Sequence, residues 1–314
     1  MKLSVFVVTY NQEKYIRQCM DGILMQKTNF DYEVVIGEDH GTDGTRAICE
    51  EYAEKYPQVR LLPLTENLGI AGNWKRVLSE CKGEYIAMCE GDDYWIDDLK
   101  LQKQVDFLEN NEDVGYLFTR HLRMRKDGTI YDFFESKNIS IPQITDLDYL
   151  LKNGIMPTTQ TVCFRSSLLP KTMPDFMNGH LYADLILLVV IADNCKIGYL
   201  NDATAVYREN IGMMSKSSTI NARETSKTLF TIYDNLNQYT HGRYKYIFAS
   251  KSYRYCILYK IYRPYRKYYP IAYFYYLAWQ LLEKGFNLKN IYTLIKNTLI
   301  KFITFLNVLF FCKK

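Results

Sequence analysis

Acidic side chains that could bind a metal ion follow two of the short apolar segments of this 314-residue chain. Glu38 and Asp39 follow one segment, and Glu90, Asp92 and Asp93 follow another. Carboxylates gathered in a partly dry cleft repel one another strongly, and a bound divalent cation relieves that repulsion. A ligand set made only of oxygen atoms favours Mg²⁺ or Mn²⁺, which usually bridge to phosphate groups. The sequence therefore predicts a Mg²⁺ or Mn²⁺ site for a phosphate-bearing ligand.

A sheet is needed to bring these carboxylates together, and the first 120 residues predict one. Apolar β-type runs alternate with segments whose apolar residues recur at helical spacing, which favours a mostly parallel α/β sheet flanked by helices. Ligands of such open sheets bind at the carboxyl ends of the strands. The predicted strands are residues 3–9, 32–36, 59–64, 84–89, 114–119 and 196–200. The predicted helices are residues 16–24, 46–56, 73–81 and 99–111, and a strongly apolar segment follows at 184–192.

The composition is that of a folded globular protein, with 48% hydrophobic and 24% charged residues. It excludes a disordered chain and a polytopic membrane protein. The longest uncharged apolar stretch, residues 268–282, is shorter than the roughly 20 residues of a membrane span, so we expect none. The amino terminus lacks the features of a signal peptide. The eight Cys form no CxxC pair or zinc spacing, which indicates a reducing, cytoplasmic compartment.

Three motifs give the chain a more specific resemblance. They are VVTYN at residues 7–11, VVIGEDHGTDGT at 34–45 and the run from NLGIAGNW to CEGDDYW at 67–95. Their order and spacing resemble family 2 glycosyltransferases, which have the GT-A fold. The resemblance covers residues 1–215, the expected catalytic domain, and leaves residues 216–314 as a helical extension. It implies an inverting, hexosyltransferase-type transfer from a nucleotide-diphosphate sugar to a hydroxyl of a glycan or lipid-linked acceptor, in cell-surface polysaccharide biosynthesis.

The resemblance also implies the donor site, which would bind a UDP-linked sugar. Asp39 would hydrogen-bond the base, and Asp92 and Asp93 would hold Mn²⁺ or Mg²⁺ and the ribose–diphosphate. Glu90 stands where the family usually has the first Asp of its DxD motif, so the charge is kept on a longer side chain. The remaining implied donor-site residues are Val8, Thr9 and Tyr10 around the nucleoside, and Asn73.

Asp184 is the candidate general base, because the segment from His180 to Leu200 aligns with the family's base-carrying segment. The alternative is that Asp184 caps a helix beginning at Leu185. The segment AVYRENIGMMS resembles the family's element beside the diphosphate, so Arg208 could reach the phosphates or could be a solvated surface residue. Trp95 is expected as a wall of the acceptor cleft, with core packing as its alternative.

The carboxyl-terminal part is strongly basic, whereas residues 1–200 carry more acidic than basic side chains. Residues 251–314 contain 12 basic residues and one acidic residue, Glu283, among many Tyr. Apolar residues recur at helical spacing between 288 and 309. Basic and apolar side chains together favour reversible binding to an anionic membrane surface, here the inner face of the cell membrane. The alternative is packing on the catalytic domain or on a second subunit. Basic residues interleaved with aromatic ones also suit single-stranded nucleic acid, but no other feature of the sequence supports that partner.

Two other functions remain open from the residues alone. A nucleotidyltransferase on a related sheet would need a Gly-rich, basic loop after the first strand, and the sequence TYNQEKYI at residues 9–16 has no Gly. A dinucleotide-dependent dehydrogenase is excluded because no GxGxxG motif follows any strand. A GT-A binding module without catalytic activity is the second alternative. The carboxylates of the implied donor and base sites argue against it, and Glu90 and Ala183, which replace the family's usual acids, argue for it.

Overall fold

The computed structural model describes residues 1–63, 66–174, 182–209, 211, 222–245 and 247–248. The chain divides into two compact units, Met1–Ser218 and Thr219–Lys314. The described part of the second unit is built on helix α9, Ala222–Tyr239. The predicted basic segment at residues 251–314 lies outside the described residues, and the predicted catalytic and membrane-surface roles of the two parts stay predictions.

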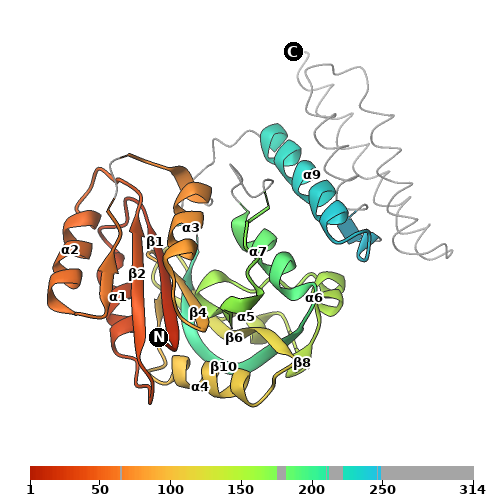
Figure 1. The fold of residues 1–314 in the computed structure, drawn as a ribbon, viewed down its shortest axis with the longest axis horizontal. Coiled ribbons are helices and arrows are strands. Elements are labelled where there is room, and N and C mark those ends of the chain that lie inside the picture. Colours follow the sequence, from red (N-terminus) through yellow and green to blue (C-terminus); the bar gives the residue numbers. More distant parts are fainter. Residues whose placement is uncertain (64–65, 175–181, 210, 212–221, 246, 249–314) are drawn as a thin grey trace, which may run out of the picture. The chain divides into compact units, whose positions relative to one another are not determined.

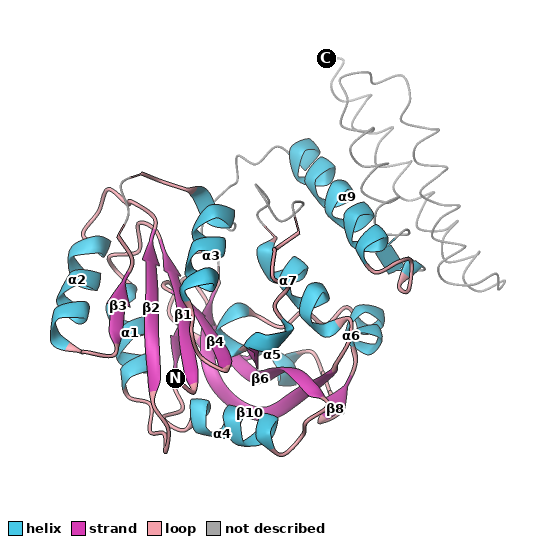
Figure 2. Ribbon diagram, in the orientation of Figure 1, coloured by secondary structure: helices cyan, strands magenta, loops and turns pink. Residues whose placement is uncertain are grey.

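The first unit is a ten-stranded sheet with helices on both sides (Figure 1; Figure 2). The strands are β1 Leu3–Thr9, β2 Tyr32–Glu38, β3 Val59–Leu61, β4 Tyr85–Glu90, β5 Tyr94–Trp95, β6 Val114–Met124, β7 Ile130–Asp132, β8 Ile144–Thr145, β9 Cys163–Arg165 and β10 Lys196–Arg208. The α-helices are α1 Ile16–Leu24, α2 Thr45–Lys55, α3 Gly69–Glu80, α4 Lys100–Glu109, α5 Phe133–Ser136, α6 Leu147–Asn153 and α7 Ala183–Ala192. Two 3₁₀ turns, η1 Thr159–Thr161 and η2 Ser166–Leu168, flank β9.

The sheet is mixed: its long strand pairings are parallel, as predicted, and the short pairings of β5, β7, β8 and β9 are antiparallel. Its strand order is β3-β2-β1-β4-β9-β6-β10-β5, with β7 and β8 paired to β6 and β10. The strands β3, β2, β1 and β4 are parallel, as predicted, and so are β6 and β10. Between these two groups β9 runs antiparallel to both of its neighbours. This arrangement keeps the carboxyl ends of β1, β2 and β4 at one edge, as the location of the acidic residues requires.

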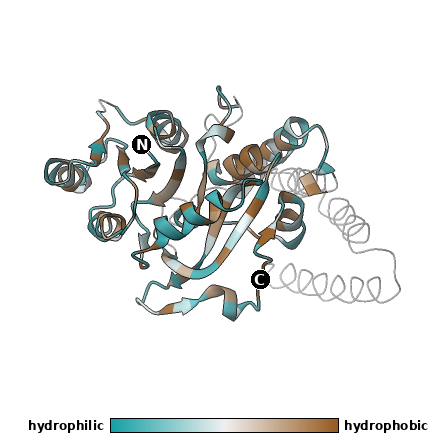
Figure 3. Cartoon of the chain, turned by 60° about the horizontal axis from the view of Figure 1, so that its bottom comes forward, coloured by the Kyte–Doolittle hydropathy of each residue, from teal (hydrophilic) through white to brown (hydrophobic). Residues whose placement is uncertain are grey.

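Each face of the central strand β1 has its own helical cover. Val5 and Val7 are fully buried in the cluster that holds the apolar faces of α1, α2 and α4. Phe6 points to the other face, where its ring meets Trp74 of α3 edge-on at a centroid distance of 5.0 Å. Most helices around the sheet mix hydrophobic and hydrophilic residues, whereas α7 is almost entirely hydrophobic (Figure 3). The uninterrupted apolar run of β1 is thus explained by burial on both faces.

Several elements extend beyond their predicted bounds, and two of these extensions bear on the cleft. Helix α3 begins at Gly69, four residues before the prediction, and the positive φ of 71° at this position is one that glycine adopts without strain. Strand β10 continues to Arg208 through the polar residues 201–202, where register shifts against β6 mark a bulge. This longer strand carries Arg208 to the acidic residues after β4. Among the described residues, no helix is both long and apolar enough to cross a membrane.

Candidate active site

A cleft of about 430 Å³ opens at the carboxyl ends of β1, β2 and β4. Its opposite wall is formed by residues 156–160, which include most of η1, and by the first residues of α7. Eight predicted site residues line it: Val8, Thr9, Tyr10, Asp39, Asn73, Glu90, Asp92 and Asp184. The structure therefore brings together side chains from elements that lie far apart in the sequence.

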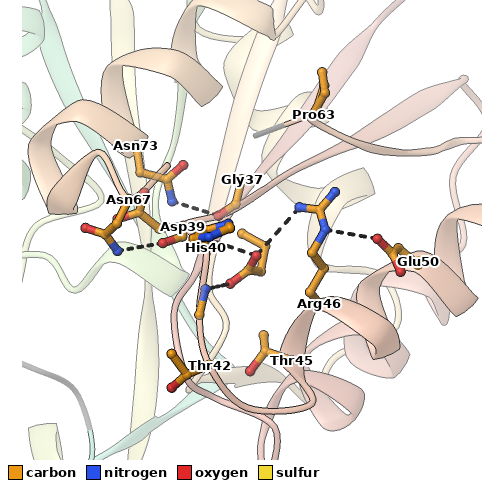
Figure 4. Close-up of polar contacts among 12 residues, drawn as sticks. Gly37, Asp39, His40, Thr42, Thr45, Arg46, Glu50, Pro63, Asn67 and Asn73 are labelled. Atoms are coloured by element: carbon orange, nitrogen blue, oxygen red, sulfur yellow. Dashed lines mark hydrogen bonds and ion pairs between the residues drawn. The ribbon is translucent and has the colours of Figure 1, made fainter. Parts of the chain in front are cut away.

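The β2 end of the cleft is built around Asp39. The Asp39 backbone N–H donates to the Thr9 carbonyl at 3.0 Å, and its carboxylate accepts the Leu68 N–H at 2.8 Å. The Asn67 amide donates to the Asp39 carbonyl at 2.6 Å (Figure 4). Asp39 is buried, and burial raises the pKa of its carboxyl group. These bonds fix a carboxylate that can accept a hydrogen bond from a ligand in the cleft.

Asn73 reaches the same region from α3. Its Nδ2 donates to the carbonyl of Gly37 at 2.7 Å, the contact drawn in Figure 4. A Cβ atom at Gly37 would lie only 2.5 Å from the Asn73 Oδ1, so a glycine is required for this close approach. The β2–α3 contact thus holds Asn73 at the wall of the cleft.

Glu38 does not join the other carboxylates, contrary to the expectation that all five would face one crevice. Its buried carboxylate accepts the Gly41 N–H at 2.6 Å and the His40 N–H at 3.2 Å, and Arg46 pairs with it at 3.6 Å. His40 has a positive φ of 57° in the same turn. Glu38 therefore stabilises the loop after β2 and has a structural role.

The carboxylates of Glu90, Asp92 and Asp93 form a cluster in which the ligand atoms lie within 4.8 Å of one another. One oxygen of Asp93 accepts the Arg208 N–H at 2.8 Å. The other, Oδ2, is buried without a hydrogen-bond partner among the described residues. An orphaned buried oxygen beside two further carboxylates fits a divalent cation, because that ion needs several oxygen ligands.

The electrostatics of the cluster point the same way. Burial, followed by the charges of Asp92 and Asp184, raises the pKa of Glu90 to about 8. Burial and the Asp92 charge raise the pKa of Asp93 well above its usual value. Both carboxyl groups therefore resist ionisation until a positive charge arrives. A bound cation would supply that charge.

Arg208 lies behind the cluster and does not line the cleft. Only 4% of its surface is exposed, so the solvated-surface alternative is wrong. Its guanidinium donates to the Asp92 carbonyl and to Gln18 Oε1, and lies 4.5 Å from the centre of the Tyr94 ring. In this arrangement Arg208 positions the loop that carries Asp92 and Asp93, and the predicted contact with phosphates stays a prediction.

Asp184 lies in the first turn of α7, which begins at Ala183 with Tyr182 as its N-cap residue. Asp184 is therefore not the cap of a helix that begins at Leu185, although its Oδ1 accepts the Leu185 N–H at 2.8 Å. Burial raises the pKa of this carboxyl group. Asp184 faces the same cleft as Glu90 and Asp92, as a base for an acceptor hydroxyl would have to.

Several cleft residues were not predicted from the sequence. Gln12 lines the cleft and accepts the Thr9 hydroxyl at 2.7 Å, and Arg123, Gln160 and Tyr207 line the far side. Tyr207 lies in the segment AVYRENIGMMS beside Arg208, so the sequence offered a signal for it, whereas no motif singles out Arg123 or Gln160. The expectation that Trp95 is a cleft wall is wrong. Trp95 is buried behind η1, where its Nε1 donates to the Gln160 carbonyl at 2.9 Å.

The mixed α/β sheet, with an acidic cluster at the ends of its strands, is the architecture of glycosyltransferases with the GT-A fold. The profile of glycosyl transferase family 2 matches residues 4–169, and the chain belongs to this family. An uncharacterised protein of Mycobacterium tuberculosis is 36% identical over 214 residues, which are 66% of this chain and 59% of that protein. This chain thus spans about three fifths of that relative. A Bacillus subtilis relative, provisionally named the teichuronic acid biosynthesis glycosyltransferase TuaG, is 28% identical over 75% of this chain and 88% of its own length.

Solved structures share the fold at low sequence identity. The structure of S. aureus TarS 1-349 with UDP-GlcNAc has a TM-score of 0.62 at 19% identity, covering 90% of this chain and 81% of that TarS fragment. The mannosyltransferase PcManGT from Pyrobaculum calidifontis, solved with GDP-Man and Mn²⁺, has a TM-score of 0.56 at 16% identity, covering 95% of this chain and 80% of its own. Both similarities show the fold.

The raised pKa of Glu90 makes the metal-free fold sensitive to pH. Its neutral form contributes stability that is complete below the ordinary glutamate pKa of 4.5 and is lost as pH rises through about 8. With a chelator present to keep the protein metal-free, we expect the Tm of the wild type to fall more steeply between about pH 5 and pH 8 than the Tm of the E90Q variant. Differential scanning calorimetry measures both slopes. E112Q, at an exposed position, is the control and should follow the wild type. Parallel profiles for wild type and E90Q would contradict this electrostatic interpretation.

Proposed function

We propose that this chain is an inverting, metal-dependent glycosyltransferase that moves a sugar from a UDP-linked donor to a hydroxyl of a glycan or lipid-linked acceptor. One observation carries the proposal: a single cleft is lined by Asp39, by two members of the acidic cluster after β4, Glu90 and Asp92, and by Asp184. UDP-GlcNAc in TarS and GDP-Man with Mn²⁺ in PcManGT support the class of donor and of ion. The name of the TuaG relative supports a role in cell-surface polysaccharide biosynthesis.

The two ends of the cleft would bind different parts of the donor, the nucleoside at one end and the diphosphate with its metal ion at the other. Val8, Thr9 and Tyr10 would surround the nucleoside, and the fixed carboxylate of Asp39 would accept a hydrogen bond from the base. Asp92 and Asp93, with Glu90, would hold Mn²⁺ or Mg²⁺. When bound, this ion neutralises the charge that develops on the departing diphosphate. The chain's own contribution is to hold the carboxylates close together before the donor arrives.

Asp184 would act as the general base in a single displacement. The acceptor oxygen forms a bond to the anomeric carbon, the bond from that carbon to the diphosphate oxygen breaks, and the hydroxyl proton passes to the Asp184 carboxylate. Attack from the side opposite the leaving group inverts the configuration. A pKa raised by burial makes the Asp184 carboxylate a stronger base.

The D184N variant should lose about 10²–10⁴-fold in kcat, because the amide cannot accept the acceptor proton. Its Kd for UDP in the presence of Mn²⁺ should stay within about twofold of wild type, since the donor carboxylates are unchanged. Turnover is measured by release of UDP and binding by calorimetry. D113N, an acid-to-amide change at an exposed turn before β6, is the matched control and should keep full activity. Wild-type kcat in D184N would exclude Asp184 as the base.

The D92N variant should bind UDP at least about tenfold more weakly in Mn²⁺, because it removes a carboxylate that holds the ion. A chelator should have the same effect on the wild type and little further effect on D92N. Calorimetric titration of UDP with and without Mn²⁺ tests both. UDP affinity that is independent of the ion and of Asp92 would contradict metal-dependent binding.

Donor hydrolysis separates an enzyme from a GT-A binding module. A catalytic protein should release UDP slowly from a UDP-sugar in Mn²⁺ even without an acceptor. A binding module should bind the donor without cleaving it. The carboxylates gathered in one cleft favour the enzyme.

We also propose that the basic carboxyl-terminal segment attaches the protein reversibly to the inner, cytoplasmic face of the membrane, where lipid-linked acceptors would be reached. The support is its composition, 12 basic residues against one acidic residue at positions 251–314. Each basic residue near an anionic leaflet contributes about 1 kcal/mol.

Removing four of these charges should therefore release the protein from anionic vesicles. The full-length variant K260Q/R263Q/R266Q/K267Q should float at least about tenfold less with phosphatidylglycerol-rich liposomes. The control K14Q/K55Q/K126Q/K137Q removes four exposed charges from the first unit and should float like the wild type. Equal flotation of both variants would argue against the basic segment as the attachment site.

A further inference from the structure

Gln160 is a buried side chain with an unusual polar environment. It is the middle residue of η1, lines the cleft and is 0% exposed. Neither its Oε1 nor its Nε2 has a hydrogen-bond partner among the described residues. Burying both atoms without partners is costly, and native structures rarely accept it without a reason.

Two other buried glutamines show what a structural role looks like in this protein. Gln104 donates to the Thr161 carbonyl at 2.9 Å and accepts the Lys100 ammonium at 2.7 Å. Gln26 donates to the Asp97 carbonyl at 2.7 Å and accepts the Leu101 N–H at 2.9 Å. In both residues the two ends of the carboxamide are satisfied within the fold. Gln160 differs from them because it lines the cleft and neither end of its carboxamide has a partner among the described residues.

Buried side chains of β5 and α4 donate hydrogen bonds to the backbone around Gln160. The Gln160 carbonyl accepts the Trp95 indole N–H at 2.9 Å. The next carbonyl, of Thr161, accepts both Gln104 and the buried ammonium of Lys100. The Thr161 hydroxyl donates back to the Thr158 carbonyl at 2.6 Å. The turn is thus fixed before any ligand binds, as expected of a site that recognises a ligand by geometry.

The location of η1 limits which part of a donor could meet this carboxamide. The turn packs against β4, where the Met88 N–H donates to the Val162 carbonyl at 3.1 Å, and β4 ends at Glu90. The same cleft is lined by Asp184. The anomeric carbon of a donor whose diphosphate is bound at the acidic cluster would have to lie between that cluster and Asp184, in the cleft that Thr159 and Gln160 of η1 also line.

The chemistry of a carboxamide selects among the groups of such a donor. An ionised diphosphate offers only acceptors, so Oε1 would have no donor and would face negative charge. Two neighbouring sugar hydroxyls can each donate and accept, and together they satisfy both Oε1 and Nε2. We propose that the Gln160 carboxamide binds a pair of hydroxyl groups on the donor sugar and determines which sugar the cleft accepts. This inference rests on the proposed function and adds a specificity-determining residue to it.

The Q160L variant tests this role, because leucine has a similar size and no polar atoms. For the best donor among UDP-Glc, UDP-Gal, UDP-GlcNAc and UDP-GalNAc, kcat/KM should fall about 10- to 100-fold. The preference for that donor over its hydroxyl epimers should shrink. The Kd for UDP with Mn²⁺ should stay within about twofold, since UDP lacks the transferred sugar whose hydroxyl groups would contact Gln160. The Tm of the ligand-free protein should hold or rise, because two unpartnered buried atoms are removed.

The outcomes are distinct. Unchanged kcat/KM and donor preference in Q160L, or an equal loss of UDP affinity and Tm, would assign Gln160 a structural role and overturn the inference alone. Wild-type protein that folds but neither binds nor turns over any of the four donors would overturn the proposed function and the inference with it. Q160N keeps the carboxamide one methylene shorter and should show the same loss of donor preference if Q160L does not fold. Q143L, at an exposed glutamine, is the matched control and should behave as wild type.

Discussion

Repulsion among Glu90, Asp92 and Asp93 is the constraint on which the rest of the site depends. Three carboxylates within 4.8 Å of one another, two with raised pKa values, would separate if the chain allowed it. Hydrogen bonds from Arg208 to the turn after β4 hold them together. The fold thus stores an unfavourable arrangement that a divalent cation would relieve, and that relief would add to the free energy of ion and donor binding.

The elements around the cleft share the work of keeping it in shape. The β2–α3 contact at Gly37 fixes Asn73, and Asn67 and Leu68, just before α3, fix Asp39. Helix α4 supports η1 through a buried ammonium, Lys100, whose pKa burial lowers to about 8. Hydrogen bonds thus position three parts of the cleft wall without a ligand, which favours recognition by preformed geometry.

The parallel core and most of the acidic site could be predicted from the sequence because both depend on local patterns. Residues close together in the sequence determine the buried run of β1, the amphipathic helix α1 and the carboxylates after β4. The antiparallel insertion of β9 could not be predicted, since a three-residue strand gives no periodic signal. The buried position of Arg208 depends on a bulge, and the unpartnered carboxamide of Gln160 depends on packing around a turn. Such features arise only when distant segments meet.

The most direct test is the location of manganese in crystals grown with Mn²⁺ and UDP. An anomalous-difference map should show one strong peak bounded by the carboxylates of Asp92 and Asp93, with Glu90 nearby and the UDP diphosphate completing the ligands. The uracil should lie on the Asp39 side of the cleft. UDP bound in this cleft without a manganese peak, or a peak away from these three carboxylates, would contradict the proposal that a cation joins the acidic cluster to the diphosphate.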